Sequence, residues 1–433
     1  MNALRNRTAF HYHAKLQDTK RIKKIKKVKN PMAYTLIGYA YNRPVYVPDD
    51  AKHVFICGTT GSGKTVAIAN YIKHACENNY PALIIDGKGD INSGSLLYYT
   101  VNFSRRKTYV VNLTDIKRSA KYNPFRNASP TVCKDMLINL TNWSEEHYKL
   151  NTERYLLRVI TLMAKNKIIL SFKSILFCAA PSRFSELSFN SQKHEIITKD
   201  EHIDNLELIK NSGKIIEGAI ARFSLLLESE LGAIFDDNGI DITTALKENA
   251  TILFILNPLI YPETSALMGR LILIDSKKAI SNLFHDTRRK FFIFDEINSY
   301  ASSVLIDLVN KSRSASVTCV LATQSLSDLD ASVNESFKEQ VIENCNNYIL
   351  LRQNSAKNAE SWANIIGTRH TIDTTYQLSS KGGSVTPTGA GTIKFNKEYI
   401  YHPDEIKNLR VGEAFFVSKD TGEKYKIIVN KPI

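Results

Sequence analysis

The sequence lacks the features that mark secreted, zinc-binding or membrane-spanning proteins. Its six cysteines include no Cys-x-x-Cys pair and no short metal-ligand spacing, and several lie inside apolar runs, which favours buried, reduced thiols in the cytosol. No run reaches the roughly 18 apolar residues of a membrane span; residues 168–181 come nearest but are interrupted by Lys173. The N-terminus lacks the apolar core of a signal peptide. No helix-turn-helix or zinc module is visible to read a DNA sequence.

Acidic residues are scarce at the N-terminus. Residues 1–30 hold ten Lys or Arg against one Asp, which gives +9 of the total net charge of +14. Within residues 20–30 the apolar residues Ile22, Ile25 and Val28 recur every third position, so one helix face could be apolar and the rest basic. Such a segment suits DNA phosphates or an anionic membrane surface equally well. A disordered solubilising tail is the alternative.

Short apolar runs separated by helical patterns predict an α/β fold with a central, mostly parallel sheet. The runs cover residues 82–85, 108–111, 251–256, 291–294, 316–321 and 348–351. Between about residues 127 and 249 the strand signal fades and apolar residues recur at helical spacing. We therefore expect a basic segment (1–48), a nucleotide-binding domain (49–126 and 250–433) and an inserted all-α domain (127–249).

A glycine-rich loop carries the strongest chemical signal. It reads Gly58, Thr59, Thr60, Gly61, Ser62, Gly63, Lys64 and Thr65, and it lies between the apolar run 53–57 and a helical pattern at 66–72. In this context backbone N–H groups converge on the phosphates of a nucleotide at a helix N-terminus. Lys64 would contact the β- and γ-phosphates, and the Thr65 hydroxyl would bind Mg²⁺. The sequence thus predicts binding of ATP and Mg²⁺.

Two further strand ends carry polar side chains. Asp295 and Glu296 follow the run 291–294, so we expect Asp295 to hold Mg²⁺ and Glu296 to act as the general base for water. Gln324 follows the run 316–321, where it could sense the γ-phosphate or merely cap a turn.

Arginines supply the candidate for a finger acting across a subunit boundary. Arg313 ends a predicted helix just before the strand that leads to Gln324, and Arg270 and Arg352 compete for the same role. Such a finger contributes about 10³–10⁵ in rate where it occurs. More often an arginine is a surface or ion-pair residue.

The order of these elements resembles a known family. The loop at 58–65, the run Asp86-Gly87-Lys88-Gly89-Asp90, the motif at 122–125, Asp295-Glu296 and the strand end at 322–325 look like the TraD/TraG-type coupling ATPases of conjugative type IV secretion. These belong to the FtsK/HerA group of DNA-pumping motors with a RecA-like P-loop fold. The similarity spans most of residues 50–420.

The resemblance implies a hexameric ATPase that drives DNA through a central channel, with a relaxase and secretion-channel components as partners. By motif, Lys64, Glu296, Gln324 and Arg313 would be its catalytic residues. Gly87 stands where the family usually has proline, and a basic segment stands where the family carries membrane-spanning helices. We expect a cytoplasmic protein, or one docked peripherally on the inner membrane through residues 20–30. The alternatives are a HerA-like repair helicase, a protein-secretion ATPase of the same fold, or a slow nucleotide-dependent assembly platform.

Overall fold

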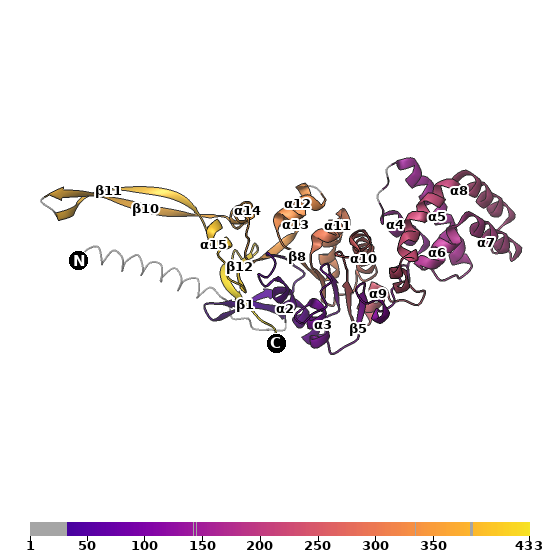
Figure 1. Ribbon diagram of the computed structural model, residues 1–433, viewed down its shortest axis with the longest axis horizontal. Coiled ribbons are helices and arrows are strands. Elements are labelled where there is room, and N and C mark those ends of the chain that lie inside the picture. Colours follow the sequence, from indigo (N-terminus) through magenta and orange to yellow (C-terminus); the bar gives the residue numbers. More distant parts are fainter. Residues whose placement is uncertain (1–32, 142, 144, 334, 382–383) are drawn as a thin grey trace.

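The computed structural model describes residues 33–433 except 142, 144, 334, 382 and 383. The basic run at 20–30 lies outside the described residues. The molecule is elongated, with a helical region at one end, a long β-hairpin at the other and a sheet between them (Figure 1). Within the described part of the chain, no helix combines the length and apolar character that a membrane span requires.

Seven neighbouring strands of the sheet are parallel and extend to one of its edges. They are β3 (His53–Cys57), β4 (Ala82–Asp86), β5 (Thr108–Asn112), β6 (Thr251–Ile255), β7 (Lys290–Phe294), β8 (Val317–Thr323) and β9 (Cys345–Leu350). The complete sheet has the order β2-β1-β13-β12-β9-β3-β8-β7-β4-β6-β5. Each apolar run expected to be a strand is one, which confirms the predicted α/β class with a mostly parallel sheet.

Four antiparallel strands extend one side of this sheet. They are β1 (Tyr34–Ala40), β2 (Arg43–Pro48), β12 (Glu413–Ser418) and β13 (Lys424–Val429), with β12 paired to β9. Residues 34–48 thus pair into the sheet, whereas the sequence places them in the basic segment. Tyr41 and Asn42 make the turn between β1 and β2 with positive φ angles of 49° and 60°. This two-residue turn has the handedness that suits a hairpin, but it lacks the glycine that usually announces one.

Helices cover both faces of the sheet. They are α2 (Lys64–Glu77), α3 (Leu96–Phe103), α10 (Pro262–Asn282), α11 (Ser303–Ser312), α12 (Leu326–Ser332), α13 (Glu335–Asn344), α14 (Ala356–Ile366) and α15 (Pro403–Lys407). Successive residues of β3 face opposite sides, as strand geometry requires. Val54 packs in one core with Ile68 of α2, whereas Phe55 packs in the other core with Leu271 of α10.

The helical region comprises α4 (Pro130–Ile138), α5 (Glu146–Lys165), α6 (Phe172–Ala179), α7 (Pro181–Lys193) and α8 (Lys199–Glu228). The helix α9 (Ile242–Lys247) packs instead on α10 and on β4 and β6 of the sheet. Helix α8 begins with a capping box: the Thr198 side chain accepts from the Glu201 N–H, and the Glu201 side chain accepts from the Thr198 N–H. Such reciprocal capping satisfies donors that an isolated helix end leaves open. Helices α4 to α9 fall within residues 127–249; the domain boundaries themselves stay predictions.

The hairpin consists of β10 (Thr368–Lys381) and β11 (Ser384–Tyr399), which pair with each other in a separate two-stranded sheet. It projects from the body beside α14 and α15 (Figure 1). The apolar side chains Ile372 and Phe395 face each other across its strands and are both exposed. No continuous apolar run marks these strands in the sequence, although two adjacent glycines, at 382 and 383, separate them as a hairpin turn would.

Candidate nucleotide site

The phosphate loop connects β3 to α2 at the carboxyl end of the parallel strands. Gly58 approaches β9 so closely that a Cβ there would lie 2.6 Å from Cβ of Leu351, which requires glycine. Gly63 precedes the first residue of α2 with a φ of 110°, a conformation that glycine adopts without strain. The first turn of α2 contains no acidic side chain, so its N-terminal N–H groups and dipole are available to an anion.

Two neighbouring segments hold this loop in place. Thr59 donates two hydrogen bonds to the carbonyl oxygen of Arg352, from its N–H at 3.0 Å and its hydroxyl at 3.2 Å. On the same side, the N–H of Gly412 donates to the carbonyl oxygen of Ser62 at 3.0 Å. The segments that follow β9 and precede β12 therefore pre-organise the loop.

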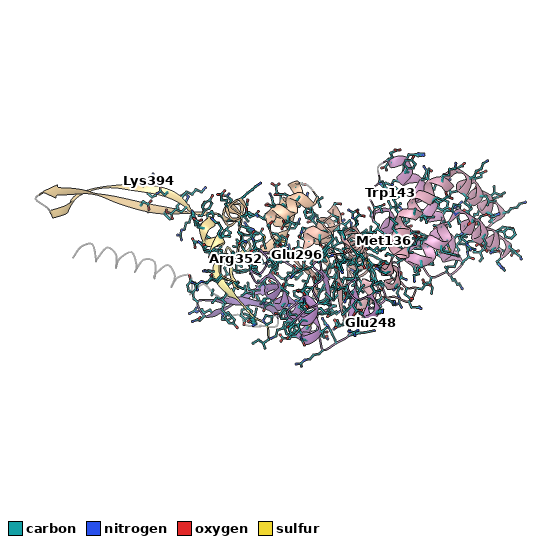
Figure 2. All side chains as sticks on the ribbon, in the orientation of Figure 1. Met136, Trp143, Glu248, Glu296, Arg352 and Lys394 are labelled. Carbon is teal, nitrogen blue, oxygen red and sulfur yellow. The ribbon has the colours of Figure 1, made fainter. Side chains whose placement is uncertain are left out.

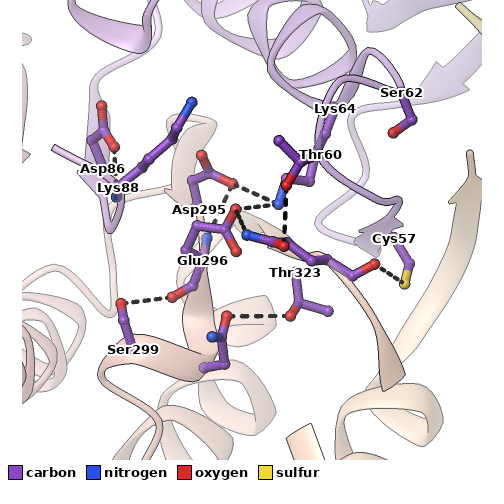
Figure 3. A network of polar contacts seen from close by, with 12 residues as sticks. Cys57, Thr60, Ser62, Lys64, Asp86, Lys88, Asp295, Glu296, Ser299 and Thr323 are labelled. Atoms are coloured by element: carbon purple, nitrogen blue, oxygen red, sulfur yellow. Dashed lines mark hydrogen bonds and ion pairs between the residues drawn. The ribbon is translucent and has the colours of Figure 1, made fainter. Parts of the chain in front are cut away.

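Lys64 lies buried between two carboxylates that arrive from β7. Its Nζ forms an ion pair and a hydrogen bond with Oε1 of Glu296, and it lies 3.9 Å from Oδ1 of Asp295 (Figure 3). The sequence separates Lys64 from these carboxylates by more than 200 residues. The sheet order β3-β8-β7 brings them together at one edge, where parallel α/β sheets bind their ligands.

Glu296 is held in a strained conformation. Its φ of 48° and ψ of 52° lie in the left-handed region, which costs a residue with a side chain about 1–3 kcal/mol. The Ser299 hydroxyl donates to its carbonyl oxygen at 2.8 Å and helps to hold this geometry. Its Oε2 atom is buried without a hydrogen-bond partner. An open, buried acceptor is what a carboxylate that must engage a water molecule needs.

Gln324 links the phosphate loop to this carboxylate. Its Nε2 donates to Oε1 of Glu296 at 3.2 Å, and its Oε1 accepts from the Thr60 hydroxyl at 3.2 Å. Beside it, the Thr323 hydroxyl donates to Oδ1 of Asn298 at 3.3 Å. One side chain thus contacts both the loop and the carboxylate, as a sensor of the γ-phosphate would.

Asp86, at the end of β4, adds a third acidic group. Burial raises the pKa of Asp86 to about 6, and burial together with the charges of Glu296 and Asp86 raises the pKa of Asp295 to about 7. Oδ1 of Asp86 accepts from the N–H groups of Lys88 and Gly89 at 2.9 and 3.1 Å. The accumulated negative charge favours a bound cation.

Gly87 packs against Asp295 and Ser299, which follow the carboxyl end of β7. A Cβ at this position would lie 2.7 Å from the carbonyl oxygen of Asp295 and 2.8 Å from the Ser299 hydroxyl. This close approach gives a physical reason for glycine at position 87 of this chain.

The oxygen ligands at this site suit a Mg²⁺ ion that is also bound by the phosphates of a nucleotide. No group of three or more His, Cys, Asp or Glu side chains within the described ranges could hold a metal by itself. Mg²⁺ keeps several waters and takes only one or two carboxylates when it also binds phosphates. Asp295 lies beside Lys64, and Thr65 is the second residue of α2. These two residues fit that role.

Arg313 lies at the amino ends of the parallel strands, opposite to the nucleotide site at their carboxyl ends. It opens the short helix η5 (Arg313–Ala315), just before the first residue of β8. Its charge helps to lower the pKa of His53, the first residue of β3, to about 4, behind burial as the larger cause. Because β8 has seven residues, about 20 Å separates Arg313 from the nucleotide edge of its own chain. The fold therefore brings Lys64 and Gln324 together at Glu296, but it places Arg313 away from them.

The remaining candidate arginines differ in position. Arg270, on α10, donates to the carbonyl oxygen of Leu140 at 3.3 Å and so contacts the segment after α4. Arg352 follows β9 beside the phosphate loop, where its Nε is buried without a hydrogen-bond partner. The sequence predicts Arg352 only as a candidate finger, because no local pattern marks the contact of its main-chain carbonyl oxygen with Thr59.

A family model described as the type IV secretion-system coupling protein DNA-binding domain matches residues 43–429. Among solved structures, the unbound bacterial conjugative coupling protein TrwB matches with a TM-score of 0.67 and 15% identity, covering 96% of this chain and 91% of that one. TrwB bound to a non-hydrolysable ATP analogue matches with a TM-score of 0.64 and 16% identity, covering 95% and 92%.

VirB4 of Thermoanaerobacter pseudethanolicus matches with a TM-score of 0.53 and 13% identity, covering 94% of this chain and 99% of that one. A comparison with curated protein sequences gives no match. The structural likenesses establish the RecA-like P-loop fold.

Proposed function

This chain belongs to the family of type IV secretion-system coupling proteins, as its motifs predict, and we propose that it hydrolyses ATP to pump DNA during plasmid or mobile-element transfer. The observation that carries the proposal is the buried contact of Lys64 with Glu296 at the phosphate loop, with Gln324 joined to both sides. A loop that binds phosphates and a carboxylate that activates water are the two parts that phosphoryl transfer needs.

Each residue of the site has a distinct role in this proposal. The loop N–H groups and Lys64 bind the phosphates, and Thr65 and Asp295 hold Mg²⁺. Glu296 orients and deprotonates the attacking water as general base. Because Lys64 contacts Glu296 in the nucleotide-free chain, a γ-phosphate that binds Lys64 would release this carboxylate for the water. Gln324 would report that change to the loop.

TrwB has been crystallised with ATP and GTP analogues and with ADP and Mg²⁺. These ligands support ATP and Mg²⁺ for this chain by family relationship. The proposed partner is DNA, bound through its phosphates, in a homo-hexamer that also contacts a relaxase and secretion-channel components. Residues 20–30 would provide a peripheral contact with the cytoplasmic face of the inner membrane.

An arginine finger that acts on a neighbouring subunit is a further part of this proposal. Since it lies about 20 Å from its own nucleotide edge, it can act as a finger only on a neighbouring subunit. Mixing Arg313→Ala subunits with Glu296→Gln subunits tests this. Each variant alone should lose turnover, and mixed rings should recover part of it, because some interfaces pair an intact Glu296 with an intact Arg313. Loss without any recovery would contradict a finger acting in trans.

DNA dependence separates the motor from its alternatives. We expect ATP turnover to rise when single- or double-stranded DNA is added, and this stimulation to fall steeply as salt rises. Turnover that no DNA changes at low salt would contradict the proposal and favour a protein-secretion ATPase or a slow assembly platform. A repair helicase of the same fold would differ by unwinding a duplex, which a strand-separation assay measures.

A further inference from the structure

Helix α10 connects two exposed apolar surfaces on opposite sides of the sheet. It begins at Pro262, after the carboxyl end of β6, and ends at Asn282, before the amino end of β7. Its 21 residues correspond to about 31 Å of helix. Leu259 and Ile260, before its start, are 92% and 64% exposed, and Phe284, after its end, is 51% exposed. The length of α10 therefore separates the two apolar surfaces.

A hydrogen-bonded turn presents the apolar pair before α10. The carbonyl oxygen of Asn257 accepts from the N–H groups of Ile260 and Tyr261 at 3.2 and 2.8 Å. The Tyr261 hydroxyl donates to Oε1 of Glu230 at 2.8 Å, which ties the turn to the segment after α8. Glu230 and Glu263 are exposed and add negative charge. We call this surface the carboxyl-end patch; it consists of Leu259, Ile260, Glu230 and Glu263.

Phe284 shares the amino ends of the strands with exposed cations. Lys290, a buried side chain, donates to the carbonyl oxygens of Arg288 and Ala315 at 2.8 and 3.1 Å. These bonds join the turn after Phe284 to the helix η5, which begins at the exposed Arg313. We call this surface the amino-end patch; it consists of the exposed side chains Phe284, Lys311 and Arg313.

The two patches are complementary in charge. The carboxylates at the amino ends of the strands have partners there, Asp286 with Arg288 and Asp307 with Lys277, so the charge of the amino-end patch is positive. The carboxyl-end patch contains two carboxylates. Complementary surfaces on opposite sides of one molecule can join copies head to tail, and such contacts form a ring when the rotation between copies closes.

We propose that the carboxyl-end patch of one copy of this chain packs against the amino-end patch of the next copy. Phe284 then covers Leu259 and Ile260, and the cations of one copy face the carboxylates of the other. Phe284 precedes β7, and Arg313 precedes the neighbouring strand β8. The same contact therefore presents Arg313 to the side of the next copy that carries the nucleotide site.

The inference rests on the proposed function only for the expectation of a ring of identical subunits. It assigns the subunit contact to the central part of the molecule, where Glu296 lies, and not to the projecting hairpin, where Lys394 lies (Figure 2). A partner of another kind on either patch is the alternative that the experiments distinguish.

Cross-linking of two introduced cysteines tests the contact. In the full chain with Mg²⁺ and a non-hydrolysable ATP analogue, Leu259→Cys combined with Phe284→Cys should give a ladder of linked chains. The bismaleimide is chosen shorter than α10, so it cannot join the two positions within one copy. Unsubstituted protein gives the background, since five of its six cysteines are buried.

The single variants distinguish a head-to-tail contact from a two-fold one. In a head-to-tail contact each position faces the other one, so Leu259→Cys alone and Phe284→Cys alone should give no links above background. Links in either single variant would show a two-fold contact and overturn the proposal. Background linking in the double variant would overturn it as well.

Sedimentation measures how much the contact contributes to assembly. Phe284→Ser should raise the concentration of half-assembly about tenfold, because assembly no longer buries an aromatic side chain. Phe189→Ser is the matched control: Phe189 of α7 is 55% exposed and lies edge-on to His202, as Phe284 lies edge-on to His285. It should leave assembly unchanged. Equal effects of the two substitutions, or monomers at every concentration, would overturn the contact and leave the patches to a partner of another kind.

Neither experiment uses DNA or hydrolysis. Turnover that DNA does not stimulate would therefore sink the motor and leave the subunit contact standing. Background linking in the double variant, together with DNA-stimulated turnover of the unsubstituted protein, would do the reverse.

Discussion

Two of the buried ion clusters among the described residues differ in how their charged groups are bonded. In the nucleotide-site cluster, Lys64 contacts Glu296 while Oε2 of Glu296 stays without a partner. In the cluster of α10, Lys278 lies 2.9 Å from Oδ1 of Asp275 and 3.3 Å from Oδ2 of Asp241. Both clusters are shielded from water, and both contain a carboxylate oxygen without a hydrogen bond, Oε2 of Glu296 and Oδ1 of Asp275, but Oδ1 of Asp275 is paired with the ammonium group of Lys278 at 2.9 Å.

The surroundings of the α10 cluster supply several further hydrogen bonds. Lys278 also donates to the carbonyl oxygens of Pro124 and Arg126 at 2.6 and 3.0 Å, and the Tyr122 hydroxyl donates to Asp275 at 2.9 Å. These bonds join α10 to the chain that leads into the helical region. A buried network that pairs its charges and forms several further hydrogen bonds stabilises and specifies a structure, whereas the strained Glu296, whose Oε2 has no hydrogen bond, indicates chemistry.

The first prediction, with a large expected effect, concerns the Glu296→Gln substitution in the nucleotide-site cluster. Glu296→Gln keeps the size of the side chain but removes its ability to accept a proton, so ATP turnover should fall about 10²- to 10⁴-fold. ATP binding should persist because the loop and Lys64 are unchanged. Phosphate release and the Kd for ATP measure the two quantities. Turnover within a few-fold of the unsubstituted protein would show that Glu296 is not the base.

The second prediction concerns the Lys278→Met substitution in the α10 cluster. Lys278→Met leaves Asp275 and Asp241 buried without their cation, so the free energy of unfolding should fall by about 3–5 kcal/mol. Lys277→Met is the control, because Lys277 pairs with Asp307 on the surface and should cost less than about 1 kcal/mol. Urea unfolding measures both. Equal costs would mean that the buried network contributes no more than a surface pair.

The smallest effect is a pH dependence of the nucleotide-site cluster. Because the pKa of Asp295 is raised to about 7, its protonated form stabilises the nucleotide-free fold at low pH, and this contribution is lost as the pH rises through 7. Mg²⁺ requires the ionised form. The affinity for Mg²⁺–ATP should therefore fall about tenfold between pH 8 and pH 6.

Asp295→Asn supplies the control for this titration, since ATP itself titrates identically with both proteins. Its affinity should be weaker than that of the unsubstituted protein at pH 8 and should show a smaller change with pH. An equal pH dependence in the two proteins, measured by calorimetry, would exclude Asp295 as the titrating group.

Local patterns in the sequence were sufficient for the parallel core and the phosphate loop. Strands covered on both faces are continuous apolar runs, so β4 and β7 could be recognised without knowledge of their partners. The glycines of the loop and the carboxylates after β7 stand at strand ends, which a parallel sheet collects at one edge. The position of Arg313, before a strand rather than after one, likewise follows from the sequence.

The two hairpins and the contacts between distant segments could not be predicted in the same way. The turn between β1 and β2 has no glycine signal, and β10 and β11 form a ribbon with polar and apolar residues mixed. The bond from Gly412 to Ser62 joins residues 350 positions apart. No short pattern records such a pairing, because the sheet order that creates it is set by the packing of the whole domain.

The central claim is that the cluster at the phosphate loop hydrolyses ATP to drive DNA. Phosphate release by Lys64→Ala, measured at saturating ATP with and without DNA, tests it most directly, with circular dichroism to verify the fold. We predict that the unsubstituted protein turns over ATP faster with DNA and that Lys64→Ala shows no turnover in either condition. Unchanged, DNA-stimulated turnover by a folded Lys64→Ala protein would contradict the account.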